Sequence, residues 1–453
     1  MEVNVAGAGA GKTTMMADLI TARPIPEGKI VFCIAFTNAA ADNITKKVEE
    51  KLGEVPDNIK ISTIHSFLYR EFINPFYSFI YGQQFEQLSV IELPGEPVYR
   101  RAKLSELNAK NILHFTEIPE KAKWITYKKN SDRKTQKEIR QKILSFFSTY
   151  CAAIFVDEAQ DINEDVKHIL ESLDAVGVRI VLYGDPKQDV KGTGCFRAII
   201  DNTDSVRYIP TCHRCPQRHL NLSNTLASDS EKQAADEDNA EGSIEIIYES
   251  DIDNIKCFLT EGNYGLKYIS KKQDRFATHE KSKDNNRLWT LYHEVYRAMI
   301  DKWIGVTSEL EIKRDSFYVT EQMLSDFDSG VSPERIITKY IRQTAFDKLD
   351  KRRYAQMISV FQSARDEIDN IPVVQSIEIV KGLEAKRCLF ILTSDLAPYL
   401  FRTKSDDNKM SHLLYVALTR STDLLAILIT REVEDEFTRE KIDGFFAKVK
   451  STK

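Results

Sequence analysis

The residues with the clearest chemistry stand at the start of the chain, in the segment MEVNVAGAGAGKTT. Its glycines are Gly7, Gly9 and Gly11, and Lys12-Thr13 follow them directly. Small residues let backbone N–H groups approach phosphate oxygens, a following lysine can reach the β- and γ-phosphates, and a hydroxyl can ligate Mg²⁺. The segment therefore predicts a phosphate-binding loop at the start of a helix. A plain Gly/Ala turn is the alternative, and it leaves Lys12-Thr13 unexplained.

Two acidic residues and a glutamine could complete a nucleotide-hydrolysing site. Asp157 and Glu158 directly follow the apolar run AAIFV, and Gln188 follows the apolar run that ends at Tyr183. Asp157 would share Mg²⁺ with Thr13, and Glu158 would orient and deprotonate the attacking water. Gln188 would sense the γ-phosphate or that water. Helix N-cap acids are the alternative interpretation of the acidic pair.

Strands must bring these side chains together. Apolar runs at 3–5, 30–35, 59–61, 152–156 and 178–183 predict one set of strands, and runs at 244–248, 266–269, 388–392 and 423–430 predict another. Continuous apolar runs are typical of parallel strands that are buried on both faces. Polar residues gather where the runs end, and doubly wound sheets bind ligands at that edge. We therefore predict an α/β fold with parallel sheets.

Three stretches depart from this strand pattern. Residues 68–149 predict a mainly helical insertion, whose part from Tyr99 to Lys142 holds thirteen Lys/Arg against five Asp/Glu. Such a run is either a set of solvated helix faces or a basic arm that contacts a phosphate backbone. Residues 271–370 predict a second helical insertion, with Leu288, Leu291, Val295 and Met299 at helical spacing. The acidic segment 228–241 is expected to be solvated.

Composition limits the remaining possibilities. The 453 residues suit two to four domains, and the formal net charge of −5 leaves nucleic-acid binding to local patches. Seven scattered cysteines favour a reducing cytoplasm over a disulfide framework. Met1 lies almost on the first strand, so we expect no leader peptide, and no apolar run approaches the ~18 residues of a membrane span.

A Cys-x-x-Cys pair occurs at Thr211-Cys212-His213-Arg214-Cys215-Pro216, with His219 nearby. These residues look like half of a zinc site, but a second cysteine pair at the required spacing is missing. We therefore favour the other feature of the segment, Arg214, as an arginine that completes a nucleotide site.

Eight motifs in order carry a family resemblance: AGAGAGKTT, AFTNAAA, STIHSF, VDEAQD, GDPKQ, HRCP, KGLE and YVALTR. The set resembles the superfamily 1 DNA helicases of the UvrD/Rep/PcrA type. The resemblance implies two RecA-like P-loop domains with ATP and Mg²⁺ in the cleft between them. The first would comprise 1–67 and 150–205, and the second 206–270 and 371–453, each carrying one of the helical insertions.

The resemblance also implies roles for individual residues. Gly7, Gly9, Gly11, Lys12, Thr13 and Thr14 would bind the phosphates, and Thr13 and Asp157 the metal. Glu158, Gln188 and two arginine fingers, Arg214 and Arg420, would be catalytic. Glu384 is expected near the ribose, and His213 stands where the family usually has an adenine-stacking Tyr. Phe36, Thr37, Asn38, Thr63, His65, Phe196 and Arg197 would line a single-strand track; Phe36 and Phe196 could instead be core residues.

The chain also departs from the family pattern. A glutamine motif that reads adenine normally precedes the phosphate loop, and the segment before Ala6 has no room for it. Asp189-Val190-Lys191 replaces the usual Ser-Ile-Tyr, which removes one base-stacking aromatic. Glu378 replaces the usual His before KGLE. The nucleotide half of the pattern is intact, and the nucleic-acid half is altered.

Two functions follow as expectations. The first is an ATP-dependent helicase or translocase, acting 3′→5′ on single-stranded or partly duplex DNA in the cytoplasm, with no membrane partner. The second is a nucleotide- and DNA-sensing regulatory ATPase with little unwinding of its own, bound to a nuclease subunit. The reduced build is similar to helicases of Gabija-like phage-defence systems. A simple P-loop kinase would leave Arg214, Arg420 and KGLE without a purpose.

Overall fold

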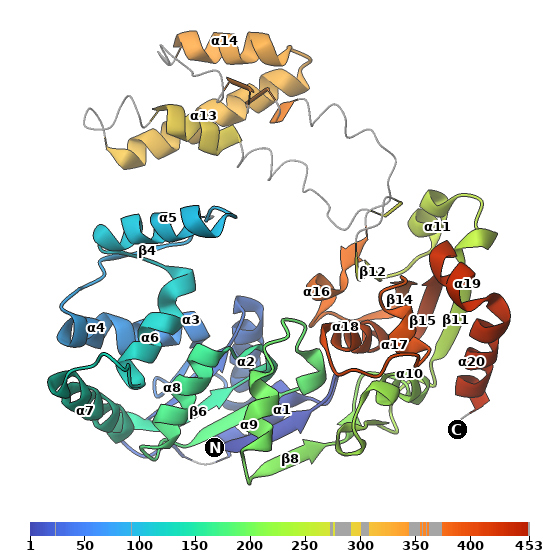
Figure 1. Cartoon of the computed structure of the whole chain (residues 1–453), viewed down its shortest axis with the longest axis horizontal. Coiled ribbons are helices and arrows are strands. Elements are labelled where there is room, and N and C mark those ends of the chain that lie inside the picture. Colours follow the sequence, from blue (N-terminus) through green and yellow to red (C-terminus); the bar gives the residue numbers. More distant parts are fainter. Residues whose placement is uncertain are drawn as a thin grey trace. The chain divides into compact units, whose positions relative to one another are not determined.

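The computed structural model describes residues 1–22, 24–91, 93–271, 275–276, 291–299, 308–343, 354–355, 357–358, 360–361 and 374–451. Much of the expected second insertion, including Leu288, and residues 371–373 lie outside the described residues. The chain forms two compact units (Figure 1). Unit 1 comprises Met1–Asp251, Tyr264–Leu266 and Val380–Lys453, and unit 2 comprises Ile252–Asn263 and Lys267–Ile379.

A six-stranded parallel sheet forms the first half of unit 1. Its order is β3-β2-β6-β7-β1-β8, and each neighbouring pair runs in parallel. The strands are β1 (Glu2–Ala6), β2 (Ile30–Ala35), β3 (Ile59–Thr63), β6 (Cys151–Val156), β7 (Ile180–Gly184) and β8 (Val206–Ile209). The predicted α/β class with parallel sheets is confirmed, and the first five strands fall where the apolar runs predict them.

Helices cover both faces of this sheet. Alternate residues of β2 face opposite cores: Phe32 and Ile34 belong to one hydrophobic cluster, and Val31 and Cys33 belong to another. This alternation is why the run is apolar throughout rather than every second residue. The helices include α1 (Lys12–Thr21), α2 (Asn38–Leu52), α8 (Glu164–Asp174) and α9 (Cys195–Asp201).

A second parallel arrangement lies in the C-terminal half of unit 1. The strands β11 (Ser243–Tyr248), β15 (Ser421–Ile429) and β14 (Ala385–Leu392) pair in that order. The helices of this half are α10 (Gln217–Ser223), α17 (Ala397–Leu400), α18 (Lys409–Leu418), α19 (Arg431–Phe437) and α20 (Arg439–Ser451). The helix α18 ends at Leu418, two residues before Arg420. Arg420 lies in the link between α18 and β15.

The segment between these halves is less exposed than its charge suggests. Two-residue strands β9 (Thr211–Cys212) and β10 (Ala234–Ala235) pair in parallel. The acidic segment 228–241 was expected to be solvated, but Glu231 and Gln233 are only 6% and 4% exposed. The expectation is wrong for these two residues because both side chains bond to groups far away in the sequence.

Residues 68–149 are mainly helical, as predicted. They contain α4 (Asn74–Tyr81), α5 (Pro97–Ala109), α6 (Ile118–Thr126) and α7 (Lys134–Tyr150), preceded by α3 (Ile64–Leu68) and a π-helical turn at Tyr69–Ile73. A short parallel pair, β4 (Gln87–Ser89) with β5 (Ile112–His114), was not predicted. Three-residue strands carry too little periodicity to be read from a sequence.

Unit 2 has a helical core of its own. Residues 291–299 are helical, and α13 (Glu309–Asp328) and α14 (Pro333–Gln343) follow them. Leu291, Val295 and Met299 are buried in its hydrophobic cluster, as their spacing predicts. The unit also contains α11 (Ile255–Glu261) and the start of α16 (Ile377–Val380), and β12 (Leu266–Ile269) pairs with β13 (Gln375–Ser376). Every helix among the described residues is too short or too polar to cross a bilayer.

Candidate nucleotide-binding site

Three neighbouring strands of the first sheet end at the predicted site. The order β6-β7-β1 places the loops after Val156, Gly184 and Ala6 side by side at the carboxyl edge of the sheet. The acidic pair, the Gln188 loop and the glycine-rich loop are therefore neighbours. Polar groups at this edge are what a doubly wound sheet needs to bind a ligand.

The glycine-rich loop presents backbone donors. Gly9 and Gly11 have φ of +70° and +74°, a conformation that a side chain would strain. The N–H groups of Gly9, Gly11, Lys12 and Thr13 donate to no acceptor within the described part of the chain. Lys12 Nζ donates to the carbonyls of Ala6 and Gly7 at 3.3 and 3.2 Å. A row of unpaired N–H groups at the start of α1, beside a lysine, fits phosphate oxygens.

The hydroxyl and carboxylate expected at the metal are already in contact. Thr13 Oγ1 donates to Asp157 Oδ2 at 2.7 Å across 144 residues of sequence. Burial, together with the nearby Glu158 charge, raises the pKa of Asp157 to about 6. A buried carboxylate short of cationic partners fits a divalent cation, since bound metal supplies the missing positive charge.

Glu158 has an unusual backbone conformation for its residue type. Its φ is +55°, in the left-handed region that costs a non-glycine residue about 1–3 kcal/mol. Gln160 Nε2 donates to its carboxylate. Burial works against ionisation, but Lys12 and Lys381 outweigh it and lower the pKa of Glu158. The Glu158 carboxylate therefore lies in an environment that favours its ionised form.

Gln188 is buried at the same edge. Its Nε2 donates to Asp185 Oδ2 at 2.8 Å, and the Asp185 N–H donates to Gln160 Oε1 at 3.0 Å. One chain of hydrogen bonds therefore runs from Glu158 through Gln160 and Asp185 to Gln188. Through this series of hydrogen bonds, a movement of Gln188 would alter the position of the Glu158 carboxylate.

The C-terminal half of unit 1 reaches the loop through the Cys-x-x-Cys segment. The His213 N–H donates to the Gly9 carbonyl at 2.9 Å, and a Cβ on Gly9 would lie 2.4 Å from Arg214 Cβ. The His213 ring is paired with Asp236 at 2.7 Å. Arg214 forms an ion pair with Glu384, so the expected finger and the expected ribose residue are partners here.

Arg420 is one of the most buried side chains of the protein, at 1% exposure. Its guanidinium donates to the Val416 and Leu383 carbonyls at 2.9 and 3.2 Å and to Thr419 Oγ1 at 3.0 Å. The structure therefore brings Arg420 onto the KGLE segment of its own half, rather than onto the phosphate loop.

The seven residues expected on a nucleic-acid track are not gathered in one place. Thr37 and Thr63 cap α2 and α3 through their hydroxyls, beside the exposed Asn38 and the partly buried Phe36 and His65. Burial, with the Lys191 charge, lowers the pKa of His65. Phe196 is 1% exposed and would touch a Cβ placed on Gly184, so it is a core residue in this structure.

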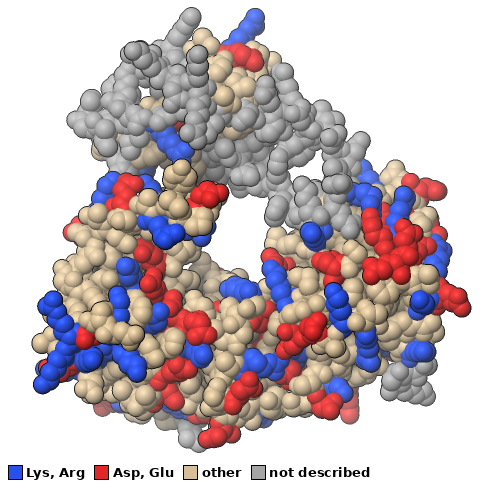
Figure 2. All heavy atoms as spheres, viewed as in Figure 1, with Lys and Arg blue, Asp and Glu red and all other residues tan. Residues whose placement is uncertain are grey.

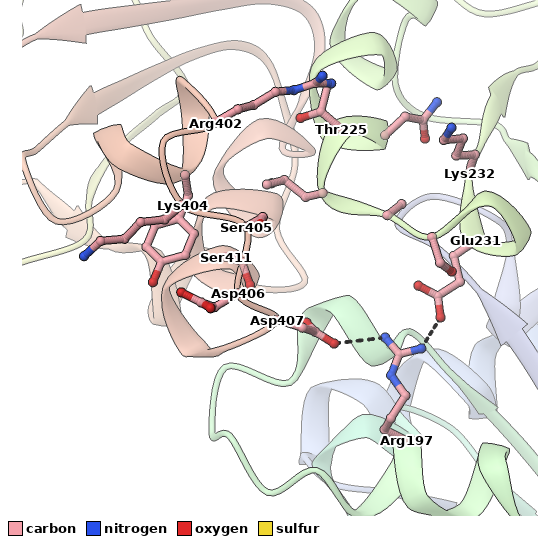
Figure 3. Close-up of a pocket in the computed structure, with 15 residues that line it drawn as sticks. Arg197, Thr225, Glu231, Lys232, Arg402, Lys404, Ser405, Asp406, Asp407 and Ser411 are labelled. Carbon is pink, nitrogen blue, oxygen red and sulfur yellow. Dashed lines mark hydrogen bonds and ion pairs between the residues drawn. The ribbon is translucent and has the colours of Figure 1, made fainter. Parts of the chain in front are cut away.

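Arg197 lines a polar cavity of about 580 Å³ instead. The cavity lies between α9, the segment 224–232 and the loop before α18 (Figure 3). Arg197 pairs there with Glu231 and, at 3.5 Å, with Asp407. Both carboxylates compete with any phosphate for this guanidinium.

Basic side chains of the first insertion lie largely on the surface. Figure 2 shows Lys and Arg gathered over the edge where Figure 1 places α7. The exposed basic residues in α7 and in the segment just before it are Lys128, Lys129, Arg133, Lys134, Lys137 and Lys142. Arg140 is buried instead and forms an ion pair with Asp132 at 2.8 Å.

Three residues near the site were not predicted from the sequence. Lys381 pairs with Asp161 at 2.9 Å, and Gln233 and Tyr415 contact the phosphate loop. Lys381 is the first residue of the KGLE motif, so the motif could have identified it as a site residue. Gln233 lies in a polar acidic segment that gave none.

His412 gives a pH-dependence that can be tested. It contacts Asp407 Oδ1 at 2.7 Å and the Asp189 carbonyl at 2.9 Å. Burial opposes the imidazolium, but these acceptors outweigh it and raise the pKa of His412. Its stabilisation is therefore complete below the unfolded pKa and is lost as pH rises through the folded one. Urea unfolding from pH 6 to 8 should show wild type losing on the order of 1 kcal/mol more than His412→Gln. A difference that does not vary with pH would contradict the assignment.

Comparison with known protein families gives a match in the first half of the chain. Residues 2–193 match the family described as "AAA domain". The comparison with curated proteins gave no match. A solved structure titled "Complex structure of Arterivirus nonstructural protein 10 (helicase) with DNA" is similar at 12% identity and a TM-score of 0.37. The alignment covers 94% of this chain and 60% of that chain, so this chain spans under two thirds of its length.

Proposed function

We propose that the chain is an ATP-hydrolysing motor of the superfamily 1 helicase type, which moves 3′→5′ on single-stranded DNA. One observation carries the proposal: a loop with unpaired N–H groups lies beside the Thr13–Asp157 contact and an ionised Glu158. The match of residues 2–193 to AAA domains supports the nucleotide-binding part. The ordered motifs support the nucleic-acid part.

The residues at the strand edge have distinct roles in this proposal. The loop N–H groups and Lys12 bind the phosphates, and Thr13 and Asp157 hold Mg²⁺, which neutralises charge on the phosphate oxygens when bound. Glu158 accepts the proton of the attacking water. Gln188 orients that water through the hydrogen-bond chain it shares with Glu158.

Arg214 must exchange partners for this chemistry. Arg214 leaves Glu384 when it turns to the phosphates, since the guanidinium cannot serve both. Glu384 then becomes free to accept from a sugar hydroxyl.

DNA is the partner that the part of the predicted track outside the core suits best. Thr37, Asn38 and His65 lie beyond the carboxyl ends of β2 and β3, next in the sheet to the nucleotide loops. The exposed lysines near α7 could add contacts to the phosphate backbone. Phe196 has no part in this proposal because its ring is in the core.

A second candidate is a nucleotide- and DNA-sensing regulatory ATPase that controls a nuclease partner, as in Gabija-like defence systems. The pairing of Arg214 with Glu384 favours it, because an ATPase held inactive suits a sensor better than a processive motor. The buried Phe196 removes one more base-stacking partner from the track.

Strand displacement by the purified chain separates these two candidates. A duplex with a 3′ single-stranded tail should be unwound with ATP, and a duplex with a 5′ tail should not. Unwinding of the 5′-tailed duplex alone would reverse the proposed direction. ATP hydrolysis without any unwinding would favour the regulatory candidate.

A further inference from the structure

The phosphate loop is held by two side chains from the other end of unit 1. The Ala8 N–H donates to Tyr415 Oη at 3.3 Å, and Tyr415 Oη donates to Gln233 Oε1 at 3.0 Å. Gln233 Nε2 donates to the Ala8 carbonyl at 3.2 Å, which closes the ring. Tyr415 and Gln233 therefore bond to both the N–H and the carbonyl of Ala8, and the carbonyl also accepts from Cys212 Sγ at 3.1 Å.

The loop has a glycine where Gln233 packs. A Cβ on Gly7 would lie 2.2 Å from Cδ and Oε1 of Gln233, which is closer than side-chain atoms can approach. Gly7 is thus needed for the contact with Gln233, whatever it contributes to phosphate binding. This close packing makes the ring of hydrogen bonds part of the loop's own structure.

Gln233 is itself fixed in place. Its backbone N–H donates to Asn224 Oδ1 and its carbonyl accepts from Asn224 Nδ2, both at 2.8 Å. Two residues earlier, Glu231 pairs with Lys187 at 3.6 Å and with Arg197. Lys187 Nζ in turn lies 5.1 Å from the centre of the Tyr415 ring. A side chain anchored on both sides can position a loop rather than follow it.

We propose that Gln233 and Tyr415 are positioning residues that hold the Ala8 peptide and thereby set the affinity of the phosphate loop for nucleotide. The inference rests on the proposed ATP-binding function and adds to it a contact between the YVALTR motif, through Tyr415, and Gln233, which lies outside the motifs. Neither side chain has to touch the substrate. Because they hold a loop that binds ground state and transition state alike, they should act on KM rather than kcat.

The test uses Gln233→Glu, which keeps the side-chain volume but replaces the Nε2 donor with an acceptor facing the Ala8 carbonyl. We expect KM for ATP to rise about 10-fold, as befits the loss of one or two buried hydrogen bonds, with kcat within about two-fold. Tyr415→Phe should do the same. The double variant should be no worse than the poorer single one, because both belong to one ring.

The matched control is Gln217→Ala. Gln217 Oε1 accepts from the Ala235 N–H at 2.9 Å, so its loss loosens the same segment without touching the loop. KM for ATP should stay at the wild-type value. Should Tyr415→Phe fail to fold, Gln233→Glu and equilibrium binding of a fluorescent ADP analogue provide the same comparison.

The outcomes separate this inference from the proposed function. Wild type that binds the ADP analogue, with Gln233→Glu binding it equally well, would overturn the positioning role and leave the proposed function standing. Equal falls in kcat and kcat/KM would also overturn it, because they indicate a transition-state role. Wild type that neither binds the analogue nor hydrolyses ATP would overturn both.

Discussion

Replacing Glu158 with Gln is expected to lower kcat for ATP hydrolysis by about 10²–10⁴-fold, the usual contribution of a general base. The amide keeps the size of the side chain and can still accept from Gln160, but it cannot take a proton from water. Nucleotide affinity should stay within about three-fold, because the loop N–H groups and Lys12 remain in place. Single-turnover hydrolysis and binding of the fluorescent ADP analogue measure the two effects separately.

Glu164→Gln is the matched control for this variant. Glu164 lies six residues further along, in the first turn of α8, and its carboxylate is largely exposed near Lys167. Its hydrolysis should equal that of wild type. A Glu158→Gln protein with unchanged kcat, or one that loses nucleotide binding as severely as hydrolysis, would contradict the role of Glu158 as base.

Alanine substitutions of Arg420 and Arg214 are expected to affect different properties, the first the stability of the fold and the second the rate of hydrolysis. Arg420→Ala removes donors from the Val416 and Leu383 carbonyls and from Thr419, all deep in the C-terminal half. Losing these hydrogen bonds together with the packing of a fully buried side chain should cost about 3–5 kcal/mol of folding free energy. Arg214→Ala loses only a pair with the half-exposed Glu384, so stability should change by about 0–1 kcal/mol. Its kcat should nonetheless fall by about 10³-fold or more, as for other arginine fingers.

Urea unfolding and steady-state hydrolysis of both variants measure this contrast. Arg214→Lys serves as the control, since it keeps the charge but not the planar fork that binds phosphate. Its kcat should recover only in part. Arg420→Ala with wild-type stability would show that its hydrogen bonds contribute little. Arg214→Ala with wild-type kcat would remove Arg214 from the catalytic set.

Local patterns predict five of the six strands of the first sheet, because each of these five contains a short apolar run that polar residues follow; β8 (Val206–Ile209), which carries Arg207, was not predicted. The run IVFCIA is a strand from Ile30 to Ala35, and the acidic pair follows directly after Val156. Parallel strands share an edge, so the pattern predicts Thr13 and Asp157 at one edge of the sheet; the strand order β6-β7-β1 that brings them into contact comes from the structure. The extents of short elements are less predictable, as the three-residue strands β4 and β5 illustrate.

Contacts between distant segments could not be predicted in the same way. Gln233 lies in an acidic segment whose composition favours solvation, yet it bonds to Ala8 across 225 positions. Arg420 lies in the motif that predicts an arginine finger. In the structure the preceding helix ends at Leu418, and the Arg420 guanidinium donates to backbone carbonyls such as that of Val416. A phenylalanine such as Phe196 suits both a base-stacking surface and a hydrophobic core, and its packing against Gly184 in the structure assigns it to the core.

The central claim is that the loop at Lys12 powers a motor that responds to nucleic acid. The most direct test is the rate of ATP hydrolysis with and without single-stranded DNA, for wild type and Lys12→Ala, repeated with GTP. We expect hydrolysis by wild type to rise at least about tenfold with DNA, in keeping with the release of Arg214 for catalysis. Lys12→Ala should be inactive under both conditions. Hydrolysis that is indifferent to DNA and survives Lys12→Ala would contradict the account.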